Sequence, residues 1–412
     1  MNEHSGSWKG VLFGLGIAAF AAYQQFKLPV VLPSMLERYG YERTLAGGFV
    51  SVYALAGLLL SVWLSRRIER SGTATPILIA MGLTISGSLL ALLQPDCGAM
   101  VLAGRALEGM GFAALAICGP VLANANATQR DLPIVIGLTA SWIPIGQLSA
   151  VALAPIALAI GDWRLLWWAG IVGAVLIIVA TLRLQRDPHV VLHPSEHAQQ
   201  IAAANAPASA VTATPKPATA MTARERNTLI IVACIFALWT GQYYAYMTWL
   251  PLYLVEAHGL AVQGALFGYV VPVVSLIAFN VVAGAMLRAG MQLGSLISIA
   301  LVTQAAVWWL LPVTGSDWSG VLSLIAYGIG AGFVTTCLFA SPSAVMGSGR
   351  STAAAFGVLM TGRNMGVLVG PVLLAWLAGS SKAWHLGGYL FGVTTSIAVV
   401  LGLWLSYRLR YR

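Results

Sequence analysis

Long apolar runs, separated by short polar segments, follow one another along almost the whole chain. A helix needs about 20 apolar residues to cross a bilayer, and a lipid-exposed backbone must satisfy its own hydrogen bonds. The pattern therefore predicts an all-α, polytopic membrane protein with about twelve transmembrane helices in two six-helix halves. The first six predicted spans are Gly10–Leu36, Leu45–Leu64, Pro76–Leu93, Met100–Val121, Leu132–Ile160 and Trp163–Leu182. The second six are Asn227–Leu254, Ala265–Leu287, Leu293–Leu311, Gly320–Phe339, Ala353–Ala378 and Leu386–Leu405.

The composition agrees with this pattern. The chain is 58% hydrophobic and 8% charged, with a mean hydropathy of +0.82. Soluble domains carry about 25% charged residues, so a soluble fold is excluded. Four cysteines lie far apart, without the spacing of a disulfide framework or a zinc site, and we expect free, buried thiols.

Charge in the loops predicts the orientation. The net charge is +9, and most Lys and Arg residues fall on one side of the predicted spans. Only Arg38, Arg43, Arg164 and Lys382 fall on the other side. The positive-inside rule then places both termini in the cytoplasm, and we expect a monomeric, multi-pass protein of a bacterial-type inner membrane. No basic patch is interleaved with aromatic residues, so nucleic acid is not an expected partner.

A polar segment rich in Ala, Pro and Thr divides the two sets of spans. We therefore expect an N-terminal half (residues 1–186), a flexible cytoplasmic linker (187–224) and a C-terminal half (225–412). The linker holds His189, His193 and His197 at a spacing of four residues. This spacing suits a metal-binding or pH-sensing helix face, but Pro194 interrupts it, which favours a solvated linker.

Short sequences recur in the two halves. LPSMLERYG (Leu32–Gly40) ends the first span, and LPLYLVEAHG (Leu250–Gly259) ends the seventh. EGMGFA begins at Glu108 in the fourth span, and YGIGAGF begins at Tyr327 in the tenth. Two repeated halves joined by a linker are typical of a transporter whose binding site lies between them, near the membrane midplane.

Four motifs resemble those of the major facilitator superfamily. SRRIERSGTAT, after the second span, resembles its cytoplasmic motif G-x-x-x-D-R-x-G-R-R, and RALEGMGFAA resembles its R-x-x-Q-G-x-G-x-A pattern. GDWR, between the fifth and sixth spans, and GRNMG, in the eleventh, match further local patterns. The resemblance implies secondary transport by rocking of the two halves, with Glu69, Arg70 and Gly72 at a cytoplasmic gate. Lys-Leu-Pro in the first span is similar to the cyanate and nitroimidazole branch, whereas the fifth span has Ala150–Val151 where drug antiporters have Gly-Pro.

Four charged residues lie inside predicted spans: Lys27, Arg105, Arg363 and Glu108. Each costs about 2.5–3.5 kcal/mol at a helix centre, so they should face a wet cavity or one another. Depths counted along the helices place Lys27, Arg105 and Glu108 at similar levels, and Arg363 near the midplane.

Three cations and one acid leave positive charge without a protein partner. We therefore predict that Lys27 and Arg363 bind an anionic substrate. Three structural alternatives remain open. Lys27 could snorkel to the interface, Arg105 could simply pair with Glu108 on one helix face, and Arg363 could bind backbone carbonyls.

Polar and aromatic residues supply the lining of this predicted site, unless they only pack or form an interfacial belt. In the first span, Tyr23 and Gln24 share a face with Lys27. The other candidates are Trp142, Gln147, Gln242, Tyr243, Tyr246 and Asn364.

Glu108 is the one proton carrier candidate inside a span, with Arg105 beside it. Its protonation would free a neighbouring cation for the anion, which predicts proton–anion symport. Two alternatives are proton-driven efflux of a neutral or cationic compound, and a transporter-like receptor or assembly partner without flux. No nucleotide loop, metal cluster or nucleophile–base pair indicates an enzyme, and no cofactor is expected.

Overall fold

The computed structural model describes residues 6–128, 131, 134–135, 138–139, 141–193, 221–346, 353–379 and 383–410. This part of the chain contains twelve helices that are long and apolar enough to cross a membrane, and no strand. They are α1 (Trp8–Tyr39), α2 (Arg43–Ser71), α3 (Ala74–Leu93), α4 (Gly98–Ala125), α6 (Trp142–Ile160), α7 (Arg164–Leu184), α9 (Ala223–His258), α10 (Val262–Arg288), α11 (Leu293–Leu310, continued by the 3₁₀ turn η1, Leu311–Val313), α12 (Trp318–Met346), α13 (Ala353–Ala378) and α14 (Trp384–Arg410). The predicted all-α, polytopic fold class is confirmed.

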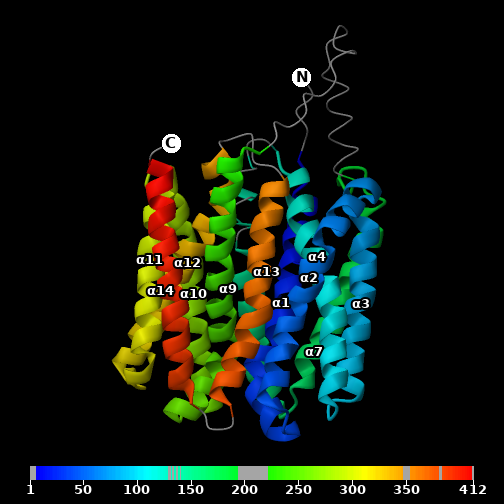
Figure 1. The fold of residues 1–412 in the computed structure, drawn as a ribbon. Coiled ribbons are helices and arrows are strands. Elements are labelled where there is room, and N and C mark those ends of the chain that lie inside the picture. The colour runs from blue at the N-terminus through cyan, green and yellow to red at the C-terminus, as the bar shows by residue number, and fades with distance from the viewer. Residues whose placement is uncertain are drawn as a thin grey trace.

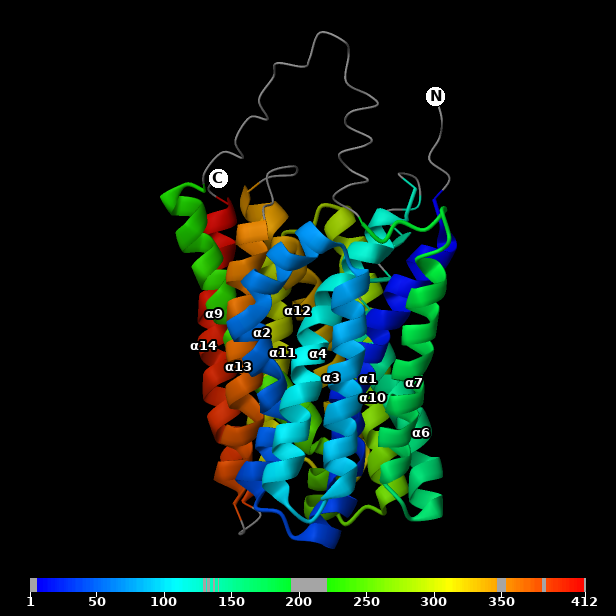
Figure 2. The same cartoon turned by 90° about the vertical axis from the view of Figure 1, so that its right-hand side faces the viewer.

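The helices run side by side in one bundle (Figures 1 and 2). The start of α1 and the end of α14 lie at the same end of this bundle, which we call the termini end; the opposite end is the far end. Most helices extend a few residues beyond the predicted spans, because their polar ends continue past the apolar stretch.

The fifth predicted span differs from the structure. Leu132–Ile160 was expected as one helix, but α6 begins only at Trp142, after a turn at Ser141. Pro144 has no N–H to donate to a preceding turn, so it is tolerated in the first turn of a helix and not in its interior. Of the residues just before this turn, 134–135 and 138–139 are helical.

The two LP…G repeats have the same structural role. Gly40 ends α1 and Gly259 ends α9, each in the left-handed conformation with φ of 61° and 65°. Glycine adopts this conformation without a Cβ penalty, and it lets the last carbonyls of the helix be satisfied. The repeated sequence is therefore a repeated helix end at the far end of the bundle.

Equivalent glycines bring equivalent helix pairs together. A methyl group on Gly146 of α6 would meet the carbonyl oxygen of Ala19 in α1, and one on Gly366 of α13 would meet that of Ala237 in α9. Small residues allow such close backbone approach between membrane helices. The α1–α6 and α9–α13 contacts thus repeat one packing arrangement.

Among the described helices, three pairs make the most extensive backbone contact between the first six and the last six: α2 with α13, α1 with α9, and α6 with α10. The α2–α13 pair is the most extensive of the three. Gly47 packs on the backbone of Pro371, and Gly57 on the side chain of Asn364. Contact between these two helices therefore runs from the far end to the middle of the bundle.

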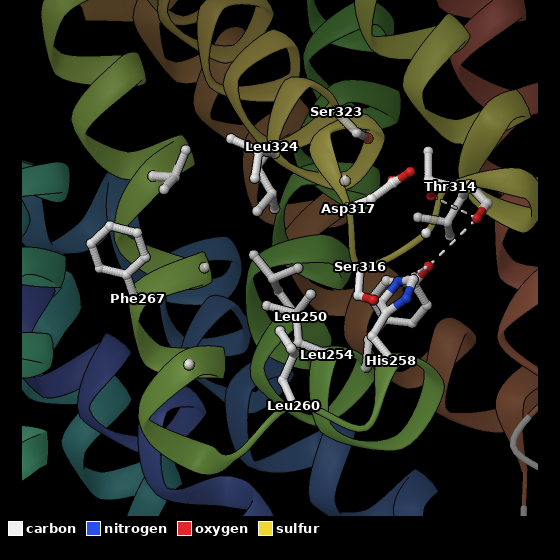
Figure 3. Close-up of a pocket in the computed structure, with 18 of the residues that line it drawn as sticks. Leu250, Leu254, His258, Leu260, Phe267, Thr314, Ser316, Asp317, Ser323 and Leu324 are labelled. Carbon is white, nitrogen blue, oxygen red and sulfur yellow. Dashed lines mark hydrogen bonds between the residues drawn. The ribbon is translucent and has the colours of Figure 1, made fainter.

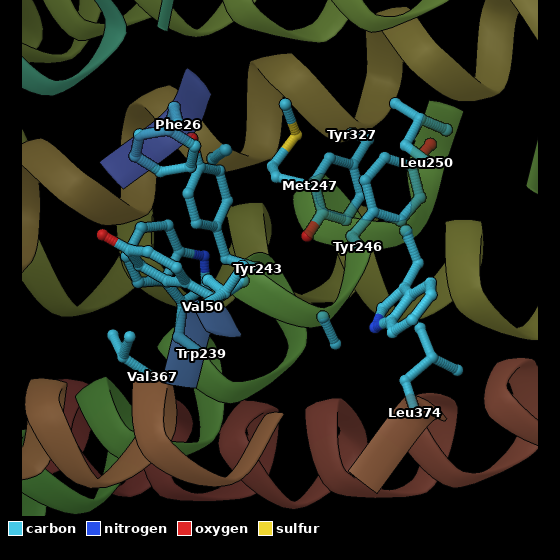
Figure 4. Packing of buried hydrophobic residues seen from close by; sticks show 14 of the residues in the cluster. Phe26, Val50, Trp239, Tyr243, Tyr246, Met247, Leu250, Tyr327, Val367 and Leu374 are labelled. Atoms are coloured by element: carbon cyan, nitrogen blue, oxygen red, sulfur yellow. The ribbon is translucent and has the colours of Figure 1, made fainter. Parts of the chain in front are cut away.

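The largest apolar cluster crosses this boundary. Figure 4 shows Phe26 of α1 and Val50 of α2 among aromatic and aliphatic residues of α9, α12 and α13. Many other large apolar side chains are exposed on the outer helix faces, as lipid contact requires.

The prediction of buried thiols holds for Cys118 and Cys337 but is wrong for Cys97 and Cys234, which are exposed. An apolar run does not reveal which of its faces packs on protein.

We predict that Gly370→Ala destabilises the protein and Gly357→Ala, on the same helix, does not. A methyl group on Gly370 would collide with the backbone of Gly241, whereas nothing lies within 4 Å of one on Gly357. Overpacking costs about 1–3 kcal/mol, while the helix propensity of Ala favours the control by up to about 1 kcal/mol. The thermal unfolding midpoints of the two purified variants measure the difference, and equal midpoints would refute this packing.

Candidate functional site

Lys27 of α1 and Glu108 and Arg105 of α4 form a buried ionic cluster. Lys27 Nζ lies 2.8 Å from Glu108 Oε1, and Arg105 Nη1 lies 2.6 Å from Glu108 Oε2. All three side chains are completely shielded from solvent. The one carboxylate therefore faces two cations, and the cluster keeps a net positive charge.

The Lys27 ammonium has no free proton in this arrangement. It donates to Glu108, to Gln24 Oε1 at 2.6 Å and to Ser88 Oγ at 3.2 Å, which uses all three of its donors. It also lies 4.4 Å from the centre of the Trp167 ring. The snorkelling alternative is wrong, because the amine points inward to α3, α4 and α7.

Four donors surround the Glu108 carboxylate. Ser88 Oγ donates to Oε1 at 2.6 Å, beside Lys27, and the Tyr53 hydroxyl donates to Oε2 at 2.7 Å, beside Arg105. Charge-assisted hydrogen bonds of this kind are about twice as strong as neutral ones. Four helices, α1 to α4, therefore meet at one carboxylate.

Arg105 also binds the backbone of α1. Its Nη1 donates to the Gln24 carbonyl at 2.8 Å, and its Nη2 to the Gln25 carbonyl at 3.0 Å. Pro29, four residues after Gln25, has no N–H, so the Gln25 carbonyl lacks its usual helical partner. Arg105 satisfies the carbonyl that the Lys-Leu-Pro sequence leaves open.

Arg363 of α13 lies apart from this cluster and has no acidic partner. Its Nη2 donates to the Tyr244 hydroxyl at 2.7 Å and its Nη1 to Asn364 Oδ1 at 3.0 Å. Among the described residues, no carboxylate lies within ion-pair distance of it, although its side chain is buried. The Tyr244 hydroxyl donates in turn to Gln25 Oε1 at 3.3 Å, across the boundary between the halves.

A second polar bridge crosses this boundary at Gln147 of α6. Tyr243 of α9 donates to Gln147 Oε1 at 3.1 Å, and Gln147 Nε2 donates to the Tyr269 hydroxyl of α10 at 3.4 Å. Of the predicted lining residues, four lie at or next to the contact between the halves: Gln147, Tyr243, Asn364 and Arg363.

Gln242 instead belongs to a closed, neutral network within the second half. Its Oε1 accepts from Trp308 Nε1 at 2.6 Å and from the Tyr327 hydroxyl at 2.7 Å, and its Nε2 donates to Gln304 Oε1 at 3.1 Å. In the sequence repeats, Gln242 corresponds to Gln24 and Tyr327 to Glu108. The second half thus has a neutral network where the first half has ions.

Three other predicted lining residues point elsewhere. The Tyr23 hydroxyl donates to the Leu166 carbonyl of α7 at 2.7 Å. Trp142 packs on Phe112, with ring centres 5.8 Å apart. Tyr246 stacks on Tyr327 at 3.7 Å, away from the boundary between the halves.

Tyr246 reaches a separate groove between α9, α10 and α12, near the far end. This groove has a volume of about 140 Å³ and is mostly apolar. Figure 3 shows its leucine side chains between Phe267 and the polar residues His258 and Asp317. Since the ionic cluster and Arg363 are not among its lining residues, we do not place the transport site there.

Comparison with known families decides the class of the protein. The model of the Major Facilitator Superfamily matches residues 14–355, most of the chain. The chain belongs to the Major Facilitator Superfamily. No individual curated protein matches it significantly. It is therefore an integral, multi-pass membrane protein and a secondary transporter of small solutes, as members of this superfamily are transporters and not enzymes.

The segment that resembles the superfamily's cytoplasmic motif lies at the termini end. Gly72 follows α2 with a φ of 71°, and the His193 ring lies directly against it. Thr73 donates to the Leu192 carbonyl from both its N–H, at 3.0 Å, and its hydroxyl, at 2.8 Å. The first residues of the predicted linker, up to His193, thus contact the loop that follows α2.

Other residues of this motif and of the histidine series lie partly outside the described residues. Glu69 and Arg70 belong to the last turn of α2, but their side chains lie outside the described residues, as does His197. Within the described part of the chain, no group of three or more His, Cys, Asp and Glu residues could hold a metal ion.

An ion pair joins the halves of this superfamily member at the far end. Arg43, the first residue of α2, binds both carboxylate oxygens of Glu256 in α9, at 2.6 and 3.1 Å. Trp384 Nε1 of α14 donates to the same carboxylate at 3.1 Å. The sequence placed Arg43 in a loop, so its role was not foreseen.

Sequence reasoning missed four residues of the site: Gln25, Tyr53, Ser88 and Tyr244. Only Gln25 carries a signal in the sequence, because Pro29 leaves its carbonyl without a helical donor. Tyr53, Ser88 and Tyr244 are common residue types in apolar helices, and the sequence does not indicate which face of the helix they occupy.

We predict that Glu108→Leu destabilises the protein more than Lys27→Met does. Removing Glu108 leaves two buried cations without a counter-charge, which costs about 3–5 kcal/mol. Removing Lys27 leaves a one-to-one pair of Arg105 with Glu108, so its cost should be smaller. Thermal unfolding of the two variants measures this order, with Glu37→Leu on the exposed face of α1 as the control. The reverse order would contradict the assigned pairing.

Proposed function

We propose that this transporter carries a small organic or inorganic anion, coupled to protons, by alternating access of a site between its two halves. The observation that carries the proposal is the buried, uncompensated charge of Arg363. It is buried at the contact between the halves, and no carboxylate among the described residues compensates its charge. An uncompensated cation in a low-dielectric interior attracts an anion strongly.

The charge balance of the bundle supports an anion over a cation. Away from the helix ends, the described spans hold three cations and the single acid Glu108. The carboxylate of Glu108 already accepts hydrogen bonds from Lys27, Arg105, Ser88 and Tyr53. A cationic compound would meet net repulsion and no open carboxylate, which disfavours the efflux alternative.

Several donors and aromatic rings accompany Arg363. Asn364 and Tyr244 contact it, and Tyr243 and Gln147 form the neighbouring bridge. Placed polar groups among aromatic walls are typical of sites for small molecules. Lys27 would contribute the positive potential of its cluster; direct contact with the anion requires that it first leave Glu108.

Glu108 is the proton carrier in this proposal. Protonation would remove the one negative charge of the cluster and make it more attractive to an anion. Release of the anion on the other side would favour release of the proton. The two ions would thus cross together.

Alternating access would require the halves to separate at each end in turn. The Arg43–Glu256 pair holds them together at the far end, and the gate motif with its docked segment lies at the termini end. The excess of Lys and Arg around the termini supports a cytoplasmic position for that end. The structure would then be one that is closed on the outer side.

We expect anions to stabilise the wild type against thermal unfolding, and not the Arg363→Ala variant. A ligand at 100 times its Kd, bound only by the folded state, adds about 2.7 kcal/mol. The panel comprises benzoate, acetate, nitrate and phosphate, with tetramethylammonium and glucose as the cationic and neutral members. Arg288→Ala, at the exposed end of α10, is the matched control. Stabilisation only by the cation or the sugar, equal in both variants, would refute the anion proposal and favour efflux.

We expect Glu108→Gln to abolish proton-driven accumulation of the stabilising anion in proteoliposomes, while exchange of that anion across the membrane continues. Glutamine keeps the shape of the side chain but cannot carry a proton. Glu37→Gln, on the exposed part of α1, should leave accumulation unchanged. Full proton-driven accumulation by Glu108→Gln would show that the proton takes another route.

A further inference from the structure

Two consecutive residues of α1 serve different parts of the polar centre. The Gln24 side chain accepts from Lys27 within the ionic cluster, at 2.6 Å. The Gln25 side chain accepts from Tyr244 of the other half, at 3.3 Å. One step along a helix turns the side chain by about 100°, so this segment of α1 faces both the cluster and the boundary between the halves.

The Gln25 side chain is only half satisfied. Its Oε1 shares the Tyr244 hydroxyl with Arg363, but its Nε2 has no hydrogen-bond partner although it is buried. Buried amide groups in proteins nearly always find a partner, and one left unpaired needs an explanation. An acceptor beside Arg363 would satisfy it, and an anion is such an acceptor.

The Gln25 backbone is bonded to the opposite side. Its carbonyl, open because Pro29 has no N–H, accepts from Arg105 at 3.0 Å. Arg105 in turn binds Glu108 at 2.6 Å. A continuous chain of hydrogen bonds therefore runs from Arg363 through Tyr244, Gln25 and Arg105 to Glu108.

We infer that Gln25 couples the two sites, and this inference rests on the proposed function. Its amide donates to the anion held by Arg363, and its carbonyl positions Arg105 beside Glu108. A movement of this segment of α1 that brings the amide to the anion also moves the carbonyl to which Arg105 is bonded. The geometry of the Arg105–Glu108 pair, and with it the proton affinity of Glu108, then depends on whether the anion is bound.

The Tyr244 hydroxyl is the second member of this connection. It is the one described group bonded to both Arg363 and the Gln25 side chain. Without it, Arg363 can still attract the anion, but its position is no longer tied to α1. Loss of this hydroxyl should therefore weaken coupling more than it weakens binding.

The test follows proton uptake when benzoate or nitrate binds the purified protein in weakly buffered detergent solution. The wild type should take up protons on binding. Gln25→Leu removes the amide and keeps the carbonyl, so it should bind about 10- to 100-fold more weakly, the range for one hydrogen bond to a charged group. At saturating anion it should take up less than half as many protons per bound anion as the wild type. Tyr244→Phe should show the same reduced uptake, with a smaller loss of affinity.

Two matched controls separate coupling from simple damage. Gln263→Leu, on the exposed part of α10, and Tyr389→Phe, on the outer face of α14, make the same chemical changes away from the centre. Both should behave as the wild type. A purely structural role of Gln25 would lower thermal stability and binding capacity but leave the protons per bound anion unchanged, which would overturn the inference.

The outcomes distinguish this inference from the proposed function. Full proton uptake at saturation by both Gln25→Leu and Tyr244→Phe overturns the coupling role while anion binding stands. Absence of benzoate and nitrate binding by the wild type, together with no stabilisation by acetate or phosphate, overturns the proposed function and this inference with it. Binding by the wild type without proton uptake overturns the coupling alone.

Discussion

The first half of the bundle is organised around one carboxylate. Glu108 receives Lys27 from α1, Ser88 from α3, Tyr53 from α2 and Arg105 from its own helix, all without access to water. Leaving any of these ions unpaired in a membrane interior would cost several kcal/mol, so the four helices must keep their mutual register. Arg105 extends this constraint to the backbone of α1, where Pro29 opens a carbonyl for it.

The second half of the bundle has no ionic cluster like the one at Glu108 among its described residues. Glu108 cannot serve a third cation, and Arg363 lies in α13, within the opposite set of helices. The repeat position of Glu108 there is Tyr327, which joins the neutral network of Gln242 and Trp308. Two halves with related packing thus pair their charges differently, and Arg363, a cation without an acidic partner among the described residues, lies in the second half. That asymmetry is what a transporter for an anion and a proton would need.

Close packing makes this arrangement rigid within each half. Glycines of α6 and α13 bring α1 and α9 into backbone contact at equivalent places. Between the halves, α2 packs closely on α13, and three polar contacts lie elsewhere on the boundary: Arg43 with Glu256, Tyr243 with Gln147, and Tyr244 with Gln25. Hydrogen bonds and ion pairs of this kind can exchange for water or substrate during a movement.

The sequence by itself determined the fold class, the approximate spans and the need for the buried charges to face a wet cavity or one another. Lipid imposes helices on apolar runs, and a charge inside a span must find a partner. It also indicated the Gly40 and Gly259 helix ends through their repeats. It was wrong about the unbroken fifth span, where a proline in a first turn was not recognised. It was also wrong about two thiols, because Cys234 lies on an exposed helix face and Cys97 just before α4.

Only the tertiary structure decided which of several neighbouring residues face the centre. The sequence singled out Gln24, Tyr243 and Gln242; the structure places Gln24 in the ionic cluster, Tyr243 on Gln147 and Gln242 in a neutral network, while Gln25 and Tyr244 contact each other across the halves. A helix of uniformly apolar composition has no polar face to mark its rotation, and one residue changes the direction of a side chain by about 100°. Which face turns inward is set by the packing of the other helices, and that information is not local to any one span.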